Sequence, residues 1–570
     1  MNPSPSVTTA GLRAALLLCT GILAACSQPQ QHQPDAISIG APPPAAAVAN
    51  AESAAPAVLA RAKTLGYAPQ TRELARMAPL PLPAPMALPT QVQADRFPDQ
   101  APNGVTLVAE QPVSTFSVDV DTASYAVVRR MLSSGAMPPP AAVRVEEMVN
   151  YFPYKYATPS KRSEPFGVTT EVMPSPWNAD NKLVHIAVRG YDIAHAERPR
   201  ANVVLLIDVS GSMGPADRLP LLKRGFRLFA SQLREQDSVS IVTYANGTAV
   251  ALEPTSGKDK DKIIAAIDAL GAGGGTAGAD GLQRAYEMAQ RQFDQKAVNR
   301  IILATDGDFN VGMRDPRELE RFIADKRKTG IYLSIFGVGT GNLNDALIQR
   351  LTQSGNGNAA YIDSLLEARK AMSEEMGSTM FPIANDVKVQ VEFNPAQVAA
   401  YRLVGYETRA LQRQDFKDDK IDAGDMGAGH SVTAIYEITP ASAAAKVVDP
   451  LRYGAAKPVA AGAGDELCFV KLRYKLPGES ASRLTQQVVR ASAARKSMQA
   501  VPEEQRFAVA VAAFGQRLRG ESHVANFSYS DIAALADSAR GADSEGYRAE
   551  FVRLVRLTES MNKAGNVGQH

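Results

Sequence analysis

The chain has 570 residues, with 61 lysines and arginines against 59 aspartates and glutamates, so its formal net charge is +2. This length exceeds one ordinary folding unit and indicates roughly two to four domains. Charges of both signs are interspersed along the chain, whereas a nucleic-acid-binding protein needs basic residues clustered on one face. The composition therefore argues against a nucleic-acid partner and for a mixed, solvated surface.

An export signal is predicted at the N-terminus. Arg13 precedes an apolar segment, residues 14–25, which is too short to span a bilayer as a helix. The segment ends in Leu-Ala-Ala directly before Cys26, and polar sequence follows at once. This pattern resembles a bacterial lipoprotein signal, which implies that residues 1–26 are the signal region and that Cys26 is lipidated. An ordinary cleaved signal with an incidental cysteine is the alternative.

The residues after this cysteine bear on where the protein is located. Ser27 stands where enterobacterial lipoproteins retained in the inner membrane carry an aspartate, so the resemblance favours an anchor in the outer membrane, facing the periplasm. Residues 27–100 are rich in Pro, Ala and Gln, a composition that cannot bury a core and predicts a disordered tether. We therefore expect a lipid-anchored protein of the bacterial cell envelope whose folded body stands off the membrane.

Residues 101–199 are expected to form a module of mixed strands and helices, rich in β-structure. The expected helices are 125–132 and 145–151, separated by prolines at 138–140, and the expected strands are 166–173 and 183–189. Residues 116–121 alternate apolar and acidic side chains. Asp119 and Asp121 could bind a metal in isolation, but this pattern favours the solvent face of an edge strand or a helix N-cap.

Residues 200–378 alternate apolar strands with amphipathic helices. The expected strands are 203–207, 238–244, 300–304 and 331–338, with shorter ones near residues 249 and 360, and the expected helices are 219–233, 260–270, 279–291, 316–326 and 345–353. Strands this apolar, separated by helices, predict a doubly wound, mostly parallel α/β sheet that is covered on both faces. Ligands bind such sheets beyond the carboxyl ends of the strands.

The remainder of the chain divides into two further parts. Residues 379–480 return to strand character, with strands expected at 387–393, 401–406, 431–438 and 467–474. This β-rich module could share one sandwich with the strands of 105–198, and Cys468, in an apolar run, is expected to be a buried structural thiol. Residues 481–570 are expected to be a C-terminal helical segment.

The chemistry-bearing stretch is NVVLLIDVSGSMG, residues 202–214. Its apolar run is long enough for a strand buried on both faces, and this strand delivers Asp208 to its carboxyl end. Ser210 and Ser212 follow at alternate positions in a tight, glycine-containing turn, so that three oxygen-bearing side chains can converge on one point. Carboxylate and hydroxyl oxygens, with no thiol or imidazole among them, suit a hard cation such as Mg²⁺.

Two later loops extend this constellation. Thr276 lies within the glycine-rich sequence GGGTAG, and Asp306 follows the strand expected at 300–304. The order D-x-S-x-S, then a glycine-flanked threonine, then a strand-terminal D-G resembles the metal-ion-dependent adhesion site (MIDAS) of von Willebrand factor type A (VWA) domains. The resemblance covers roughly 180 residues.

This resemblance implies a role for each residue. Ser210, Ser212 and Thr276 would bind the ion directly, while Asp208 and Asp306 would act directly or through water. Mg²⁺ is the expected ion, with Mn²⁺ or Ca²⁺ as alternatives. Neutral hydroxyl ligands leave the ion electrophilic, so that an open coordination position can accept a carboxylate from a partner protein. Asp308 could serve as an outer hydrogen-bond acceptor or be merely an exposed acid.

The flanking sequence narrows the resemblance. The stretches FSVDVDTASYAVVRR (116–130) and PPPAAVRVEEMVNYFPY (138–154), together with residues 392–429, look like bacterial lipoproteins of the YfbK type. Such proteins carry one module before the VWA domain and an uncharacterised module after it. The likeness extends over most of residues 105–560, and it implies architecture rather than a named partner.

The sequence favours a binding protein over an enzyme. The histidines of the body, His185, His195, His430 and His523, are scattered, and none lies in a hydrolase or metalloprotease motif. We therefore expect metal-dependent protein–protein adhesion or assembly and no catalytic residues. A metal-independent structural scaffold of the envelope, binding through the flanking β-module, is the alternative. A hydrolase acting on envelope substrates is less favoured.

Overall fold

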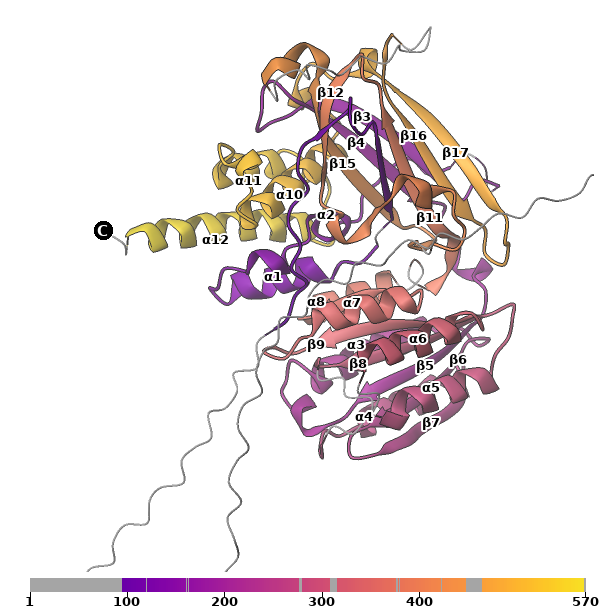
Figure 1. Ribbon diagram of the computed structural model, residues 1–570. Helices are drawn as coiled ribbons and strands as arrows, with labels where there is room; N and C mark the ends of the chain where they lie inside the picture. Colours follow the sequence, from indigo (N-terminus) through magenta and orange to yellow (C-terminus); the bar gives the residue numbers. More distant parts are fainter. Residues whose placement is uncertain are drawn as a thin grey trace, which may run out of the picture. The chain divides into compact units, whose positions relative to one another are not determined.

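The apolar runs of residues 201–362 form a six-stranded sheet in the order β10-β9-β8-β5-β6-β7 (Figure 1). The computed structural model describes residues 95–567 except 119, 160, 162, 276–278, 308–314, 376–377, 379, 422 and 447–463. The strands are β5 (Ala201–Asp208), β6 (Ser238–Tyr244), β7 (Thr248–Ser256), β8 (Val298–Thr305), β9 (Ile331–Val338) and β10 (Ala359–Ile362). Strand β7 runs antiparallel to β6, and the other pairings are parallel. The prediction of a doubly wound, mostly parallel sheet is confirmed.

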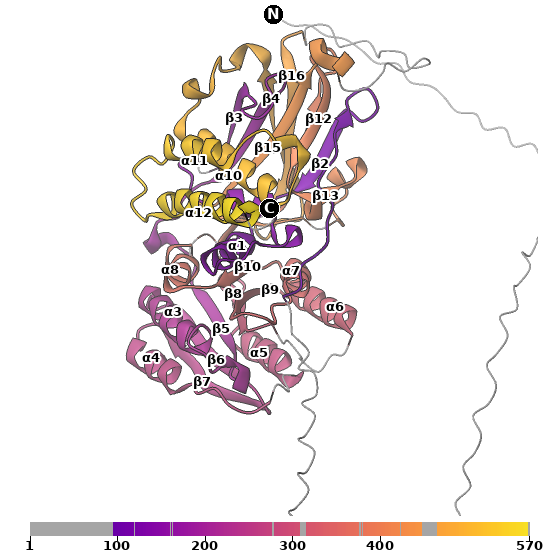
Figure 2. The same cartoon turned by 90° about the vertical axis from the view of Figure 1, so that its left-hand side faces the viewer.

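Helices cover both faces of this sheet (Figure 2). They are α3 (Leu219–Gln232), α4 (Lys260–Ala269), α5 (Ala279–Arg291), α6 (Pro316–Arg327), α7 (Asp345–Ser354) and α8 (Leu365–Arg369). Because side chains alternate along a strand, Leu205 packs in the core under α3, α4 and α8, whereas Leu206 packs in the core under α5, α6 and α7. Strand β5 is buried along its whole length, as its apolar run predicts.

Two further sheets face each other across a shared apolar core. One has the order β1-β12-β15-β4-β3 and the other β13-β2-β11-β16-β17, with β14 paired to β11. The strands of the first are β1 (Thr106–Leu107), β3 (Phe166–Pro174), β4 (Lys182–Gly190), β12 (Val398–Val404) and β15 (Ser431–Pro440). Those of the second are β2 (Val113–Ser117), β11 (Pro382–Phe393), β13 (Ala410–Leu411), β14 (Met426–Gly427), β16 (Glu466–Lys475) and β17 (Ser482–Arg490).

The strands before and after the central α/β domain interleave in this sandwich. Strand β4 pairs with β15, and β2 pairs with β11, so that each sheet takes strands from both sides of residues 200–378. The colours in Figure 1 show the early strands β3 and β4 beside the late strand β15. The segments 101–199 and 379–480 are predicted as two modules whose strands could share one sandwich, and in the structure their strands do form one. Cys468 lies in its core, where burial raises the pKa of the thiol to about 12.

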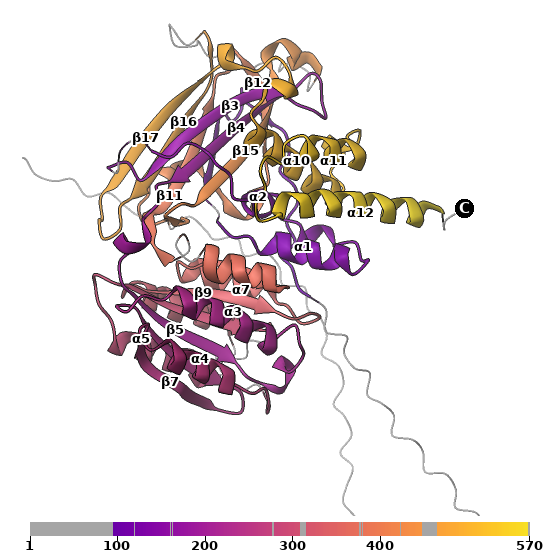
Figure 3. The ribbon, with the colours of Figure 1, turned by 180° about the vertical axis from the view of Figure 1, so that it is seen from behind.

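A third core is helical. It gathers α1 (Ala123–Ser133), α2 (Val145–Asn150), α10 (Glu503–Leu518), α11 (Tyr529–Asp537) and α12 (Tyr547–Val567). Residues 482–490, which were assigned to the helical segment, instead form β17 at the edge of the sandwich (Figure 3). That assignment was wrong because β17 carries the β-branched residues Thr485, Val488 and Val489 and finds a pairing partner in β16.

Buried ion pairs join the helical core to the α/β domain. The guanidinium of Arg129, on α1, pairs with Asp363 and with Glu367 of α8 at 2.8 Å. It also lies 3.2 Å from Glu550 of α12 and donates to the Tyr151 hydroxyl at 2.9 Å. One buried cation is thus shared by three carboxylates from two parts of the fold, an arrangement whose hydrogen bonds offset the cost of removing the charges from water.

Candidate metal centre

Two aspartates meet at the carboxyl edge of the six-stranded sheet. Asp208 is the last residue of β5, and Asp306 directly follows β8. Because β5 and β8 are adjacent parallel strands, with Ile207 opposite Ala304, both carboxylates reach the same edge. Both residues are 0% exposed. The sheet therefore brings two buried acids together, as predicted.

The turn after β5 adds the two serine hydroxyls. The backbone N–H of Ser210 donates to Asp208 Oδ1 at 2.9 Å, which folds the turn back on the strand end. A single helical turn, Gly211–Met213, then places Ser212 Oγ 3.0 Å from Ser210 Oγ. Asp208, Ser210 and Ser212 thus present oxygen atoms within one turn.

The glycine-rich loop packs directly against this turn. The N–H of Gly211 donates to the Gly274 carbonyl at 2.9 Å, and the N–H of Gly273 donates to the Val209 carbonyl at 2.8 Å. A side chain at Gly211 would place its Cβ 3.1 Å from the Gly274 oxygen, so the close approach favours glycine there. Thr276 follows this loop and, like Asp308, lies outside the described residues. The role of Thr276 as a ligand stays a prediction.

Arg218 is the functional residue that the sequence reading missed. Its guanidinium pairs with the Asp306 carboxylate, and it also donates to the carbonyls of Ser212 at 2.8 Å and Thr340 at 3.0 Å. Gly339, with φ of +76°, makes room for it, since a Cβ there would lie 2.3 Å from Arg218 Nε. In the sequence, Arg218 is an ordinary basic residue before a helix. The signal that could have identified it is Gly339, after β9, because a residue without a side chain is needed where Arg218 packs.

The charges of the site do not balance among the described residues. Arg218 pairs with Asp306, whereas no described cation pairs with Asp208. Burial raises the pKa of the Asp208 carboxyl; hydrogen bonds from Ser210 oppose this, and the neighbouring Asp306 carboxylate adds to it. Asp306 Oδ1 is buried and has no hydrogen-bond partner. An unpartnered acceptor beside a second buried carboxylate leaves a place where a cation would be stabilised.

The donor set matches a hard divalent cation. Ser210 and Ser212 offer hydroxyl oxygens, and Asp208 and Asp306 offer carboxylates, all of them ligand types that Mg²⁺ accepts. The described part of the chain holds no cluster of three or more His, Cys, Asp or Glu side chains suited to a metal. A metal centre among these residues would therefore depend on the hydroxyls, which are the ligands that the D-x-S-x-S pattern supplies.

Two of the histidines lie in the sandwich rather than beside this edge. His185, on β4, is fully buried with Nε2 3.2 Å from the Tyr156 hydroxyl, and burial lowers its pKa to about 3. His430 directly precedes β15, and burial likewise lowers its pKa to about 3. Both imidazoles are therefore neutral at pH 7.

Comparisons with known proteins agree with this fold. A von Willebrand factor type A domain model matches residues 203–308, and a second von Willebrand factor model matches residues 91–185. The model for the C-terminal region of the uncharacterized protein YfbK matches residues 378–561. The uncharacterized protein YfbK of Escherichia coli strain K12 is 44% identical over 483 residues, which cover 84% of this chain and 82% of that protein.

The chain belongs to the YfbK family. Among solved structures, this YfbK-family chain is similar to a von Willebrand factor type A protein from Catenulispora acidiphila, with 16% identity, 69% of this chain and 91% of that chain covered, and a TM-score of 0.38. It is also similar to the ArnB paralog VWA2 from Sulfolobus acidocaldarius, with 14% identity, 70% and 98% coverage, and a TM-score of 0.34. Because the type A domain model matches residues 203–308, the YfbK-family chain is a VWA domain protein, as the resemblance implied.

The unpaired carboxylate predicts an effect of pH on the metal-free protein. Because burial raises the folded-state pKa of Asp208, the native state binds more protons than the unfolded state between the unfolded pKa, about 3.9, and the higher folded pKa. Its contribution to stability therefore falls as pH rises through that window. We expect Asp208→Asn, which keeps the acceptor for the Ser210 N–H, to melt a few degrees higher than the unaltered chain in chelator at pH 7.

Thermal unfolding followed by circular dichroism in chelator at pH 7 and pH 4 checks this. The advantage of Asp208→Asn should shrink at pH 4, because the raised pKa of the Asp208 carboxyl leaves less of it charged there than at pH 7. A lower melting temperature for Asp208→Asn at pH 7 would show that the Asp208 charge is already compensated.

Proposed function

We propose that this protein is an envelope-anchored binding protein whose VWA domain holds a divalent cation and uses it to adhere to, or assemble with, another protein. The observation that carries the proposal is the convergence of two buried aspartates and two serine hydroxyls at one sheet edge, with a single arginine as the described counter-charge. Proteins of the VWA class are generally adhesion or scaffold proteins, which supports a binding role over catalysis.

The cation would be held by Ser210, Ser212 and Thr276, with Asp208 and Asp306 acting directly or through water. Mg²⁺ is the first choice, and Mn²⁺ or Ca²⁺ are alternatives. Once bound, the ion supplies an electrophilic point that accepts a carboxylate oxygen from the partner. The chain's own contribution is positional: the Ser210 N–H orients Asp208, and the contact between Gly211 and Gly274 holds the glycine-rich loop against the serine turn.

Arg218 favours a second candidate function. Its guanidinium already pairs with Asp306 and bridges the loops after β5 and β9, so that part of the negative charge is neutralised by the protein itself. A VWA domain that keeps this pairing would act as a metal-independent scaffold, with partners bound through the flanking β-sandwich. Metal titration separates the two candidates.

We expect the protein to bind Mg²⁺ and Mn²⁺ saturably in isothermal titration calorimetry. Asp208→Ala should weaken binding by more than the roughly 10–100-fold that loss of an outer partner costs a metal site. Asp261→Ala, which removes an exposed carboxylate on α4, is the matched control and should bind as the unaltered chain does. Equal Mg²⁺ affinity of Asp208→Ala and the unaltered chain would favour the metal-independent scaffold.

The anchor is a separate part of the proposal. Cys26 lies outside the described residues, and within the described ones no helix is long and apolar enough to cross a membrane. We propose that a lipid on Cys26 attaches the protein to the bacterial envelope, at the outer membrane and facing the periplasm. The lipoprotein-like sequence around Cys26 supports this.

Cell fractionation with Cys26→Ser tests the anchor. The unaltered chain should sediment with outer membranes and take up a labelled fatty acid, whereas Cys26→Ser should do neither, because a serine hydroxyl does not replace the thiol that carries the lipid. Cys468→Ser is the control, since that thiol is buried in the sandwich core and should leave fractionation unchanged. Membrane association of the Cys26→Ser variant would contradict lipid anchoring at this residue.

A further inference from the structure

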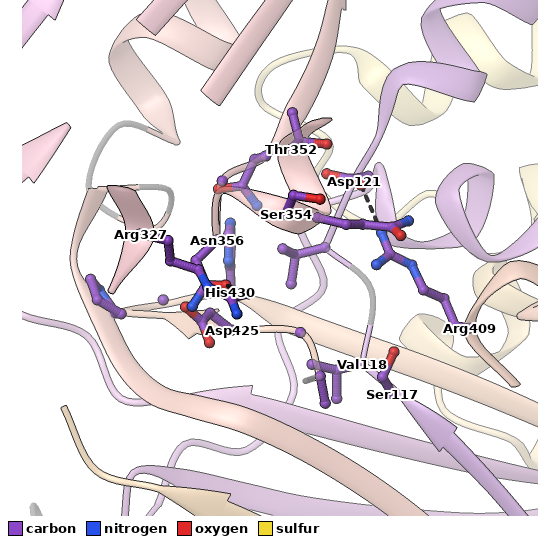
Figure 4. Close-up of a pocket in the computed structure, with 18 of the residues that line it drawn as sticks. Ser117, Val118, Asp121, Arg327, Thr352, Ser354, Asn356, Arg409, Asp425 and His430 are labelled. Atoms are coloured by element: carbon purple, nitrogen blue, oxygen red, sulfur yellow. Dashed lines mark hydrogen bonds and ion pairs between the residues drawn. The ribbon is translucent and has the colours of Figure 1, made fainter. Parts of the chain in front are cut away.

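A polar cavity lies between the α/β domain and the sandwich. Its volume is about 390 Å³, within the range of roughly 300–1,000 Å³ typical of small-molecule sites. The α/β domain lines it with β8, the end of α6 and the loop between α7 and β10, and the sandwich lines it with the residues that follow β2 and precede β15. Figure 4 shows Arg327, Asn356, Asp425 and His430 gathered at one end of the cavity.

Arg300 is the residue of this cavity that the fold itself does not explain. It lies on β8, is 3% exposed, and lines the cavity. Its Nη1 donates to Ser334 Oγ at 2.6 Å, while its Nε is buried without a partner. No ion pair joins Arg300 to a carboxylate in the described part of the chain. The Asp425 carboxylate, which lines the same cavity, and the Tyr332 ring, whose centroid lies 5.8 Å from the guanidinium carbon, favour the charge of Arg300. Its buried Nε still lacks a hydrogen-bond partner, which is costly because this N–H has left water.

The other two arginines that line the cavity, Arg327 and Arg409, have hydrogen-bond or ion-pair partners. Arg409 pairs with Asp121 at 2.8 Å, the pair marked by a dashed line in Figure 4. The expectation that Asp121 lies on a solvent face or caps a helix was wrong: it is 3% exposed and also accepts the Ala359 N–H at 2.8 Å. Arg327 donates to Asn356 Oδ1 at 2.9 Å. Among these arginines, Arg300 is the one whose buried Nε has no hydrogen-bond partner.

The charge states of Arg300 and His430 are also compatible with an anionic ligand. Burial lowers the pKa of Arg300 to about 10, while Tyr332 and the Asp425 carboxylate oppose this effect, so the guanidinium is still charged at pH 7. Burial also lowers the pKa of His430, and the nearby cations Lys370 and Arg300 lower it further, so this imidazole is neutral. Its buried Nδ1 has no hydrogen-bond partner and is available to a ligand.

We propose that this cavity binds a small polar anion through a carboxylate or phosphate group that is seated on Arg300. A guanidinium binds either group with two parallel hydrogen bonds, and Arg300 has one nitrogen that is buried and unpartnered. Asn356 and His430 line the same cavity and supply polar contacts for the rest of the ligand.

This site is distinct from the metal centre. Arg300 lies near the start of β8, whereas Asp306 follows its end, and an offset of six positions along an extended strand corresponds to about 20 Å. The two sites therefore lie at opposite ends of the strands of one sheet. The anion site does not depend on the proposed adhesion function, because it rests on residues that the metal centre does not use.

Calorimetry of the full chain with sodium phosphate and, separately, sodium succinate tests the proposal, in a chloride-free buffer without divalent metal. We expect saturable binding of at least one of them, and the tighter of the two identifies the group. Arg300→Met should weaken binding by about tenfold or more, as expected on losing a charge-assisted hydrogen-bond pair. Without anion, its melting temperature should equal or exceed that of the unaltered chain, because the buried guanidinium with its unpartnered Nε is gone.

Two further variants make the result decisive. Arg321→Gln removes an exposed arginine from α6 and should leave anion binding unchanged. Arg327→Gln, at the end of the same helix, removes a positive charge from the cavity lining and should therefore weaken anion binding. This variant provides the test if Arg300→Met does not fold. The proposal is overturned if neither anion binds saturably, or if the variants with changes at positions 300 and 327 bind as tightly as Arg321→Gln.

Discussion

The VWA domain depends on the burial of two like charges at one end of its sheet. Asp208 and Asp306 are both fully buried, and a fold places such a pair together only where something offsets their repulsion. Arg218 supplies part of the offset by pairing with Asp306. The turn that carries Ser210 and Ser212 then surrounds Asp208 with oxygen atoms rather than with a second cation. A divalent ion would complete this charge balance, and on that basis we propose adhesion through a bound metal.

Buried charged groups of opposite sign lie near the two ends of strand β8 in this sheet. At the carboxyl edge the described residues leave the buried Asp208 carboxylate without a paired cation, and near the other end of β8 the buried Nε of Arg300 has no hydrogen-bond partner. Each of these groups lies where two segments of chain meet: the serine turn and the glycine-rich loop at one end of the sheet, the α/β domain and the sandwich at the other. Unsatisfied buried groups of this kind are expected at sites of function.

Local patterns predicted the elements of the α/β domain and most strands of the sandwich, but not which sandwich strands pair, for a physical reason. Strand β5 and helix α3 follow from the apolar runs and periodicity of their own residues, so their predicted bounds agree with the structure. Pairing is not local: Ile186 of β4 lies opposite Ala434 of β15, with the whole α/β domain between them in sequence. Arg218 was missed for the same reason, because its partners Asp306 and Thr340 become neighbours only when β8 and β9 are placed in the sheet.

The most direct test of the account is to locate the ion itself. Crystals of the protein grown with Mn²⁺ should show an anomalous difference peak, recorded at the manganese absorption edge, beside the hydroxyls of Ser210 and Ser212. We predict that peak at the carboxyl edge of the sheet, close to Asp208 and Asp306. A map without a peak at this edge, with Arg218 still paired to Asp306 at a saturating Mn²⁺ concentration, would contradict the claim that the site is completed by a metal.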